Sequence, residues 1–197
     1  MLRLEHLARP GLAPVSLKLP TGACGVVMGP SGAGKTLLAR AIVDLDPNSG
    51  EVFWKERSRA AMPACQWRRL IGYAPAQSGW WADVVGDHFL KPVAADTLRA
   101  VNLPPDAPTW PVARLSNGEK QRLALLRALA AGPEMLILDE PTAALDDETK
   151  ERVEALLQRR LEDGLTLLLI THDKAQARRL GRHFWRIDSG HLTEGGP

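Results

Sequence analysis

The sequence has little of several features that would place it in a specialised class of protein. It holds only two cysteines, Cys24 and Cys65, among 197 residues. Two thiols are too few for a disulfide framework, and they suit a reducing cytoplasm. Its apolar runs fall far short of the roughly 18 residues that span a bilayer, and no long apolar segment follows the charged N-terminus. We therefore expect neither a membrane span nor a signal peptide, so any role at a membrane needs a partner chain.

An excess of charge of one sign is also missing. The net charge is +2, charged residues make up 24% of the chain and apolar residues 45%, which is ordinary for one globular domain with a sizeable core. Two basic clusters lie at residues 57–59 and 178–182, but neither is interleaved with aromatic residues. We interpret them as solvated faces and expect no nucleic-acid partner.

Glycine is concentrated where its conformational freedom is useful, between residues 29 and 36. This stretch fits the pattern Gly, any four residues, Gly-Lys-Ser/Thr, which binds nucleotide phosphates. Glycines let consecutive backbone N–H groups converge on one anion. Lys35 brings a positive charge to the β- and γ-phosphates, and the Thr36 hydroxyl can ligate Mg²⁺. The alternative is a glycine-rich turn that holds a lysine by chance.

The flanking segments decide between these alternatives. An apolar run precedes the loop and a helical pattern follows it, so the bound anion would lie at a helix N-terminus. We therefore predict that a nucleoside triphosphate binds here. The predicted binding residues are Gly29, Pro30, Ser31, Gly32, Ala33, Gly34, Lys35 and Thr36.

The order of patterns predicts an α/β fold. Residues 2–7 and 15–19 alternate apolar and polar side chains around Pro10-Gly11, which indicates an N-terminal antiparallel β edge. Further along, apolar strands alternate with helical patterns, which indicates a mainly parallel sheet. The expected strands of this later part are 51–54, 71–74, 135–138, 165–170, 184–187 and 191–192.

The stretch from residue 78 to residue 114 differs in character from the rest. It holds five of the fifteen prolines, the adjacent Trp80 and Trp81, and spacing suited to short helices. We interpret it as a helical subdomain inserted into a single domain of residues 1–197, whose ATP-binding core is 1–77 and 115–197. The tryptophans either fill the small core of this insert or face a partner.

Three polar residues follow buried strands. Asp139 and Glu140 end one strand, and His172 lies just after another. Carboxyl ends of parallel strands meet at one edge of a sheet, which is where ligands bind. Taken singly, these residues could be a turn cap, a surface acid before proline and a structural histidine. Placed together beside the phosphate loop, they fit metal binding, general-base catalysis and phosphate contact.

Several segments, in chain order, resemble motifs of the ATP-binding subunit of ABC transporters. Residues 29–36 match its phosphate loop, and the sequence Ser-Asn-Gly-Glu at 116–119 is similar to its signature, usually Leu-Ser-Gly-Gly-Gln. Residues 135–140 match the strand that ends in an aspartate and a glutamate. Residues 144–146 match the loop that follows, and 171–173 match the switch-histidine segment. The resemblance covers the whole chain and implies a P-loop NTPase core.

The resemblance also implies a role for each residue. Asp139 would hold Mg²⁺ through a water, together with Thr36, and Glu140 would orient and deprotonate the attacking water. His172 would contact the γ-phosphate, and Asp146 would serve communication in the dimer.

The signature implies a second subunit. In the family, this segment contacts ATP held by the opposite subunit, so two ATP molecules lie between two head-to-tail subunits. Ser116 and Glu119 form a capping-box pattern, and the helix N-terminus that they predict attracts anions. The local alternative is simply a well-capped helix. The expected contact residues are Ser116, Asn117, Gly118 and Glu119.

Three positions depart from the family pattern. Asn117 replaces a glycine, although asparagine tolerates left-handed backbone conformations. The usual glutamine position holds Ala76, and we expect the neighbouring Gln77 to serve as the metal-site glutamine. Arg9 stands near the position of the adenine-stacking aromatic, and a guanidinium can also stack on a base.

The implied function is that of an ATP-hydrolysing transporter subunit. Its cofactors would be ATP and Mg²⁺, and its partners a second ATPase subunit and an integral membrane subunit at the inner face of the cell membrane. In build the chain is similar to small iron-export-type ATPases. One alternative is an ABC-type ATPase acting on nucleic acid or ribosomes, but the chain has no long coiled coil or tandem cassette. A small-metabolite P-loop kinase is another, but it would have no use for Ser116 or His172.

Overall fold

Residues 1–196 are described by a computed structural model, in which the strands form two sheets. The larger sheet has the order β10-β9-β3-β8-β7-β6, and all its pairs are parallel except β9 with β10. Its strands are β3 (Cys24–Met28), β6 (Ile71–Ala74), β7 (Met135–Asp139), β8 (Thr166–Ile170), β9 (His183–Asp188) and β10 (His191–Glu194). The smaller sheet is antiparallel, in the order β2-β1-β4-β5. It contains β1 (Leu2–Arg9), β2 (Leu12–Leu19), β4 (Ser49–Trp54) and β5 (Arg57–Ser58).

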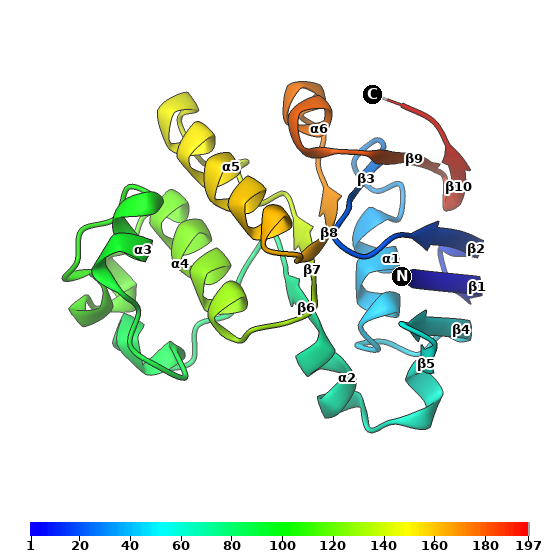
Figure 1. Ribbon diagram of the computed structural model, residues 1–197, viewed down its shortest axis with the longest axis horizontal. Coiled ribbons are helices and arrows are strands. Elements are labelled where there is room, and N and C mark those ends of the chain that lie inside the picture. The colour runs from blue at the N-terminus through cyan, green and yellow to red at the C-terminus, as the bar shows by residue number, and fades with distance from the viewer. Residues whose placement is uncertain (197) are drawn as a thin grey trace.

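The helices are distributed between the two faces of the parallel sheet. They are α1 (Lys35–Ile42), α2 (Ala64–Leu70), α3 (Ala95–Ala100), α4 (Asn117–Ala130), α5 (Asp147–Glu162) and α6 (Lys174–Leu180), with short 3₁₀ turns at Arg59–Ala61, Val85–His88, Ala107–Thr109 and Val112–Arg114. Figure 1 shows α4 and α5 on one side of the parallel sheet and α1 with the antiparallel sheet on the other. The predicted α/β fold with a mainly parallel sheet and an antiparallel N-terminal edge is confirmed.

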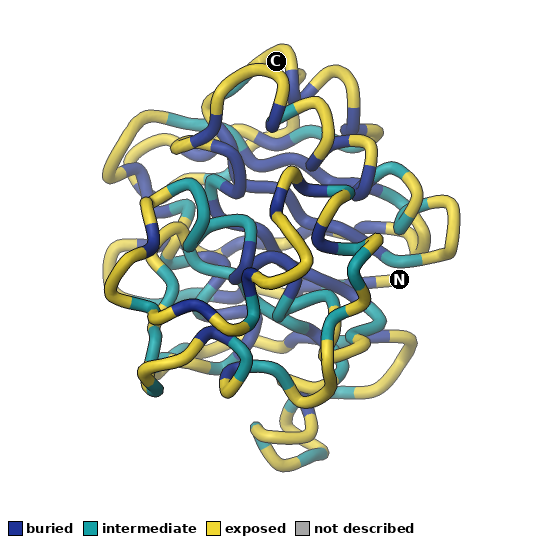
Figure 2. Tube along the Cα trace, turned by 90° about the vertical axis from the view of Figure 1, so that its left-hand side faces the viewer, coloured by how far each residue is buried: buried dark blue, intermediate teal, exposed yellow. Residues whose placement is uncertain are grey.

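Strand β7 explains why the central strands are continuous apolar runs in the sequence. Met135 and Ile137 belong to the core on one face, whereas Leu136 and Leu138 belong to the core on the other. All four side chains are 0% exposed. Because successive side chains of a strand point to opposite faces, a sheet covered on both sides requires apolar residues at every position. Figure 2 shows buried segments gathered through the middle of the molecule, with exposed segments around its edge.

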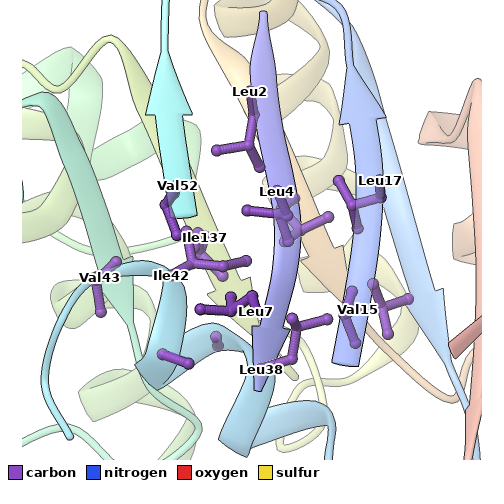
Figure 3. Packing of buried hydrophobic residues seen from close by; sticks show 14 of the residues in the cluster. Leu2, Leu4, Leu7, Val15, Leu17, Leu38, Ile42, Val43, Val52 and Ile137 are labelled. Atoms are coloured by element: carbon purple, nitrogen blue, oxygen red, sulfur yellow. The ribbon is translucent and has the colours of Figure 1, made fainter. Parts of the chain in front are cut away.

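The first core lies between the two sheets and encloses α1. Leu38 and Ile42 of α1 are fully buried and pack among Leu4 and Leu7 of β1 and Ile137 of β7, as Figure 3 shows. An eight-residue helix would be marginal alone, so this packing, rather than helix propensity, stabilises it. The helix that carries the phosphate loop is therefore fixed between two sheets.

The second core joins the stretch 78–114 to the opposite face of the parallel sheet. Leu98 of α3 and Trp110 pack in the same buried cluster as Leu123 of α4 and Leu157 of α5. The stretch contains α3 and three of the 3₁₀ turns, connected by loops.

Within residues 1–196, no helix is both long and apolar enough to cross a membrane.

The two cysteines differ enough to give a direct test of this packing. Cys24 lies in β3 and is buried, whereas Cys65 is exposed. Burial raises the pKa of the Cys24 thiol to about 12, although the charge of Arg182 acts in the opposite direction. Since the thiolate is the reactive form, we expect a maleimide at pH 8 to modify one thiol in the native protein and both after denaturation. Native labelling should disappear in Cys65→Ser, and equally fast labelling of both thiols would show that β3 is accessible.

Candidate functional site

The phosphate loop begins where β3 ends, and two of its glycines are required by its shape. Gly29 has φ +154°, and a Cβ at this position would lie 2.0 Å from the carbonyl oxygen of Ile187 in β9. Gly34, at the N-cap of α1, has φ +109°. A side chain would strain both positions. The loop is thus held against β9 and leads directly into the N-terminus of α1, which favours an anion.

Lys35 is the first residue of α1, and its side chain reaches back across the loop. The Nζ atom donates hydrogen bonds to the carbonyl oxygens of Gly29 and Pro30, each at 2.8 Å. The ammonium group is therefore placed over the turn formed by the loop backbone. From this position it is able to exchange a carbonyl partner for a phosphate oxygen, which is the stronger, charge-assisted acceptor.

A cavity of about 800 Å³ adjoins the loop and contains all three predicted catalytic residues, Lys35, Glu140 and His172. Its walls come from the phosphate loop and α1, from the carboxyl end of β7 and from the residues after β8. The lining residues are Gly29, Pro30, Ser31, Gly32, Gly34, Lys35, Thr36, Leu37, Ala76, Asp139, Glu140, Ala143 and His172. Residues more than 130 positions apart in the chain thus meet here because β3, β8 and β7 are adjacent in the sheet.

The oxygen donors expected for Mg²⁺ lie side by side in this cavity. The Thr36 hydroxyl donates to Oδ2 of Asp139 at 2.7 Å, and the Tyr73 hydroxyl donates to the same oxygen at 3.2 Å. Burial, and then the neighbouring Asp139, raise the pKa of Tyr73, which keeps its hydroxyl protonated as a donor. A hydroxyl and a carboxylate suit Mg²⁺, which completes its coordination with waters and substrate phosphates. The residues present therefore fit this ion.

Glu140 and His172 are directly paired. Nδ1 of His172 lies 2.9 Å from Oε2 of Glu140. The carboxylate side chain is 20% exposed, whereas the imidazole is 72% exposed and lies at the mouth of the cavity. A carboxylate oriented in this way can accept a proton from a water, and the histidine can contact a group entering from outside.

The predicted start of α4 is confirmed in detail. The Ser116 hydroxyl accepts from the Glu119 N–H at 3.2 Å, and the Glu119 carboxylate accepts from the Ser116 N–H at 2.8 Å. The four signature residues are not among those that line the phosphate-loop cavity of this chain. Asn117 instead lines a neighbouring depression of about 420 Å³ with Gln77 and Glu140.

Three other predicted site residues, Gln77, Arg9 and Asp146, do not line the phosphate-loop cavity. Ala76 lines the phosphate-loop cavity, whereas Gln77 lines only the neighbouring depression. Arg9 is paired with Asp46, and its side chain is 16% exposed. Asp146 is the N-cap of α5 and accepts hydrogen bonds from the backbone and side chain of Thr149, which lower its pKa.

Several residues that contact predicted site residues were not identified from the sequence. Asp46 also accepts two hydrogen bonds from Arg40, at 2.6 and 2.7 Å, and these arginine contacts hold the pKa of its carboxyl well below the usual range. Tyr73 donates a hydrogen bond to Asp139, and Gln121 contacts the backbone of Glu140. Neither Asp46 nor Tyr73 has a local sequence signal. Gln121 could have been suspected, because it lies just beyond the signature-like segment.

A parallel sheet with a phosphate loop between β3 and α1, and acidic residues at the end of β7, defines a P-loop nucleoside triphosphatase. The family described as ABC transporter matches residues 12–143. The chain belongs to this family. It is an ATP-binding subunit that hydrolyses ATP.

Comparison with known proteins agrees with this assignment. The chain is 36% identical over 193 residues to an aliphatic sulfonates import ATP-binding protein of Pseudomonas fluorescens, covering 94% of this chain and 70% of that protein. It is 37% identical to a methionine import ATP-binding protein of Mesorhizobium japonicum, covering 100% of this chain and 60% of the relative. Among solved structures, a dimeric ATP-binding cassette in a post-hydrolysis state with ADP and Pi superposes with a TM-score of 0.83 at 25% identity, over 98% of each chain.

Proposed function

We propose that this chain works in pairs, with two ATP molecules shared between the subunits, to drive conformational change in an integral membrane transporter subunit. The proposal rests on one observation, that the predicted site residues of one chain fall into two separate groups. Glu140 and His172 line the cavity of the chain's own phosphate loop, whereas the capped helix N-terminus at Ser116 does not. Such a helix end binds anions, so a second subunit that presents it would complete the site.

The proposed chemistry follows from the contacts in the cavity. ATP binds with its β- and γ-phosphates on the loop, where Lys35 and the N-terminus of α1 balance their charge. Mg²⁺, held by Thr36 and Asp139, would supply further charge neutralisation on the phosphates. The water oxygen bonds to the γ-phosphorus as the bond to the leaving ADP breaks, and the Glu140 carboxylate accepts a proton from that water. His172 contacts the γ-phosphate.

The membrane partner is proposed to meet residues 78–114, which we assign as the helical subdomain. Trp81 is 70% exposed and Leu90 is 88% exposed. They share a depression of about 310 Å³ with Ala124 and Ala128 of α4 and with Arg127. Exposed tryptophan beside arginine is typical of interface anchors. This surface would place the subunit at the inner face of the cell membrane.

One arginine of each basic cluster has a structural partner, and Arg59 is mostly buried rather than part of a solvated face as predicted. These contacts support a transporter role over a nucleic-acid role. Arg59 donates to the Ala41 carbonyl oxygen and to Asn48, and its side chain is only 11% exposed. Arg179 forms two hydrogen bonds with the buried carboxylate of Glu154.

Purification of the tagged chain from membranes tests the proposal and the docking surface together. We expect the wild type to co-purify with an integral membrane protein, and Trp81→Ala to lose both this association and transport in proteoliposomes while basal ATP hydrolysis stays within about twofold. Trp80→Ala is the matched control: Trp80 packs against the core, so we expect a lowered melting temperature instead. Wild type that never associates with a membrane protein would contradict the function. Intact transport by Trp81→Ala would contradict only the docking surface.

A further inference from the structure

Gln121 lies in the second turn of α4 and contacts both ends of the loop that follows β7. Its Nε2 donates to the carbonyl oxygen of Glu140 at 2.5 Å, and its Oε1 accepts from the backbone N–H of Ala144 at 3.1 Å. One side-chain amide thus uses its donor and its acceptor to close the loop from Glu140 to Ala144.

The backbone of Glu140 needs such support. Its φ is +51°, a left-handed conformation that residues other than glycine rarely adopt. Backbone of this kind persists only where its surroundings hold it. The N–H of Glu140 donates to the carbonyl oxygen of Ile170 at 2.9 Å, so β8 fixes one side of the residue. Gln121 fixes the other side through the carbonyl oxygen.

The first turns of α4 contact the same loop through their backbone, and they contact the 78–114 stretch through a second side chain. A Cβ at Gly118 would lie 3.0 Å from the carbonyl oxygen of Ala144, so the helix backbone rests against the same loop. Arg122, the next residue after Gln121, donates to the carbonyl oxygens of Val101 and Asn102 at 2.9 and 2.5 Å, just after α3. The consecutive side chains of Gln121 and Arg122 therefore connect α4 to the loop that follows β7 and to the 78–114 stretch.

We infer that Gln121 is a positioning residue for Glu140, which transmits the placement of α4 and of residues 78–114 to the catalytic carboxylate. The inference rests on the proposed function, in which α4 begins at the segment that meets the ATP of the opposite subunit. A helix held there by the opposite nucleotide would keep Gln121, and through it Glu140, in the geometry that pairs with His172. The nucleotide bound at one site would thus influence the position of Glu140 at the other site.

The variant Gln121→Glu tests whether Gln121 positions Glu140, and it hardly changes the shape of the side chain. It replaces the donor that faces the Glu140 carbonyl with a carboxylate oxygen, while an acceptor for Ala144 remains. We expect kcat for ATP to fall at least about tenfold and the Kd for ATP to stay within twofold, because a misplaced catalytic group slows chemistry without removing phosphate contacts. Gln158→Glu makes the same change on α5, where the amide donates to Glu162 and does not line the phosphate-loop cavity, so it should leave both values unchanged.

A double-mutant cycle separates positioning from general destabilisation. If Gln121 acts through Glu140, adding Gln121→Glu to Glu140→Gln should slow the residual turnover by less than about twofold. A full additional tenfold loss in that background would overturn the inference, as would wild-type kcat in Gln121→Glu. If Gln121→Glu does not fold, Gln121→Met, which keeps length and helix propensity without hydrogen bonds, is put through the same cycle. Failure of both variants to fold would make Gln121 a folding residue and overturn the inference.

Failure of the role inferred for Gln121 can be distinguished from failure of the proposed function. If the wild type does not hydrolyse ATP, or Glu140→Gln does not form an ATP-dependent dimer, the proposed function fails. If both of these hold and the Gln121 variants hydrolyse ATP normally, only the role of Gln121 fails.

Discussion

Replacing Glu140 with glutamine is expected to slow ATP hydrolysis by at least about 100-fold and to trap a dimer that holds ATP. Glutamine keeps the shape of the side chain and its contact with His172, but it cannot accept the proton of the attacking water. It also removes one negative charge beside the γ-phosphate, which favours the bound state. Steady-state phosphate release measures the first effect. Light scattering of the protein with ATP, and then with ADP, measures the second.

A surface carboxylate gives the control for this change. Glu148→Gln alters an exposed acid on α5 that forms a surface ion pair with Arg152, so its turnover should stay within about twofold of the wild type. Hydrolysis at the wild-type rate in Glu140→Gln would remove Glu140 from the mechanism. A monomer that transfers phosphate to a small molecule would instead favour a kinase.

Lys35→Ala is expected to weaken ATP binding by about 100-fold, roughly 2.7 kcal/mol, and to abolish ATP-dependent dimerisation. The lysine supplies the only side-chain ammonium among the residues that line the phosphate-loop cavity. Loss of a charge-assisted contact to phosphate has this magnitude. The fold should survive, because the two carbonyl groups released by the substitution lie in a loop that water can reach. Titration with a fluorescent ATP analogue and light scattering measure the two effects.

The matched control is Lys18→Ala, which removes an exposed lysine of β2. It should bind ATP and dimerise as the wild type does. If Lys35→Ala dimerised on addition of ATP at wild-type nucleotide concentrations, the model of a site shared between two subunits would be wrong.

The local elements of the fold could be predicted because their signals are local. Ser116 and Glu119 are three residues apart and cap the same helix turn, so the sequence contains the whole interaction. The apolar run at 135–138 reads as a strand because each face of the sheet is covered, which requires an apolar residue at every position. The pattern in the stretch 78–114 predicted only short helices, because much of the chain there adopts 3₁₀ turns and loops that carry no strong period.

The contacts that tie the site together could not be predicted in the same way. Tyr73 lies 66 residues from Asp139, and Arg9 lies 37 residues from Asp46. The left-handed backbone of Glu140 has no sequence signal either, because non-glycine residues adopt it only under outside constraint. The stacking of Arg9 on a base stays a prediction, now with a guanidinium held by Asp46.

The sequence by itself determined the chemistry of this protein: a phosphate loop from Gly29 to Thr36, acids at the end of one buried strand and a histidine at the end of another. These motifs depend on neighbours in the chain, so the order of residues is sufficient to define them. Only the tertiary structure decided that β3, β8 and β7 lie side by side, and hence which of these groups meet. It also decided that the helix N-terminus at Ser116 stays outside this chain's own phosphate-loop cavity. The physical reason is that strand order is set by packing on both faces of the sheet, between residues far apart in the chain.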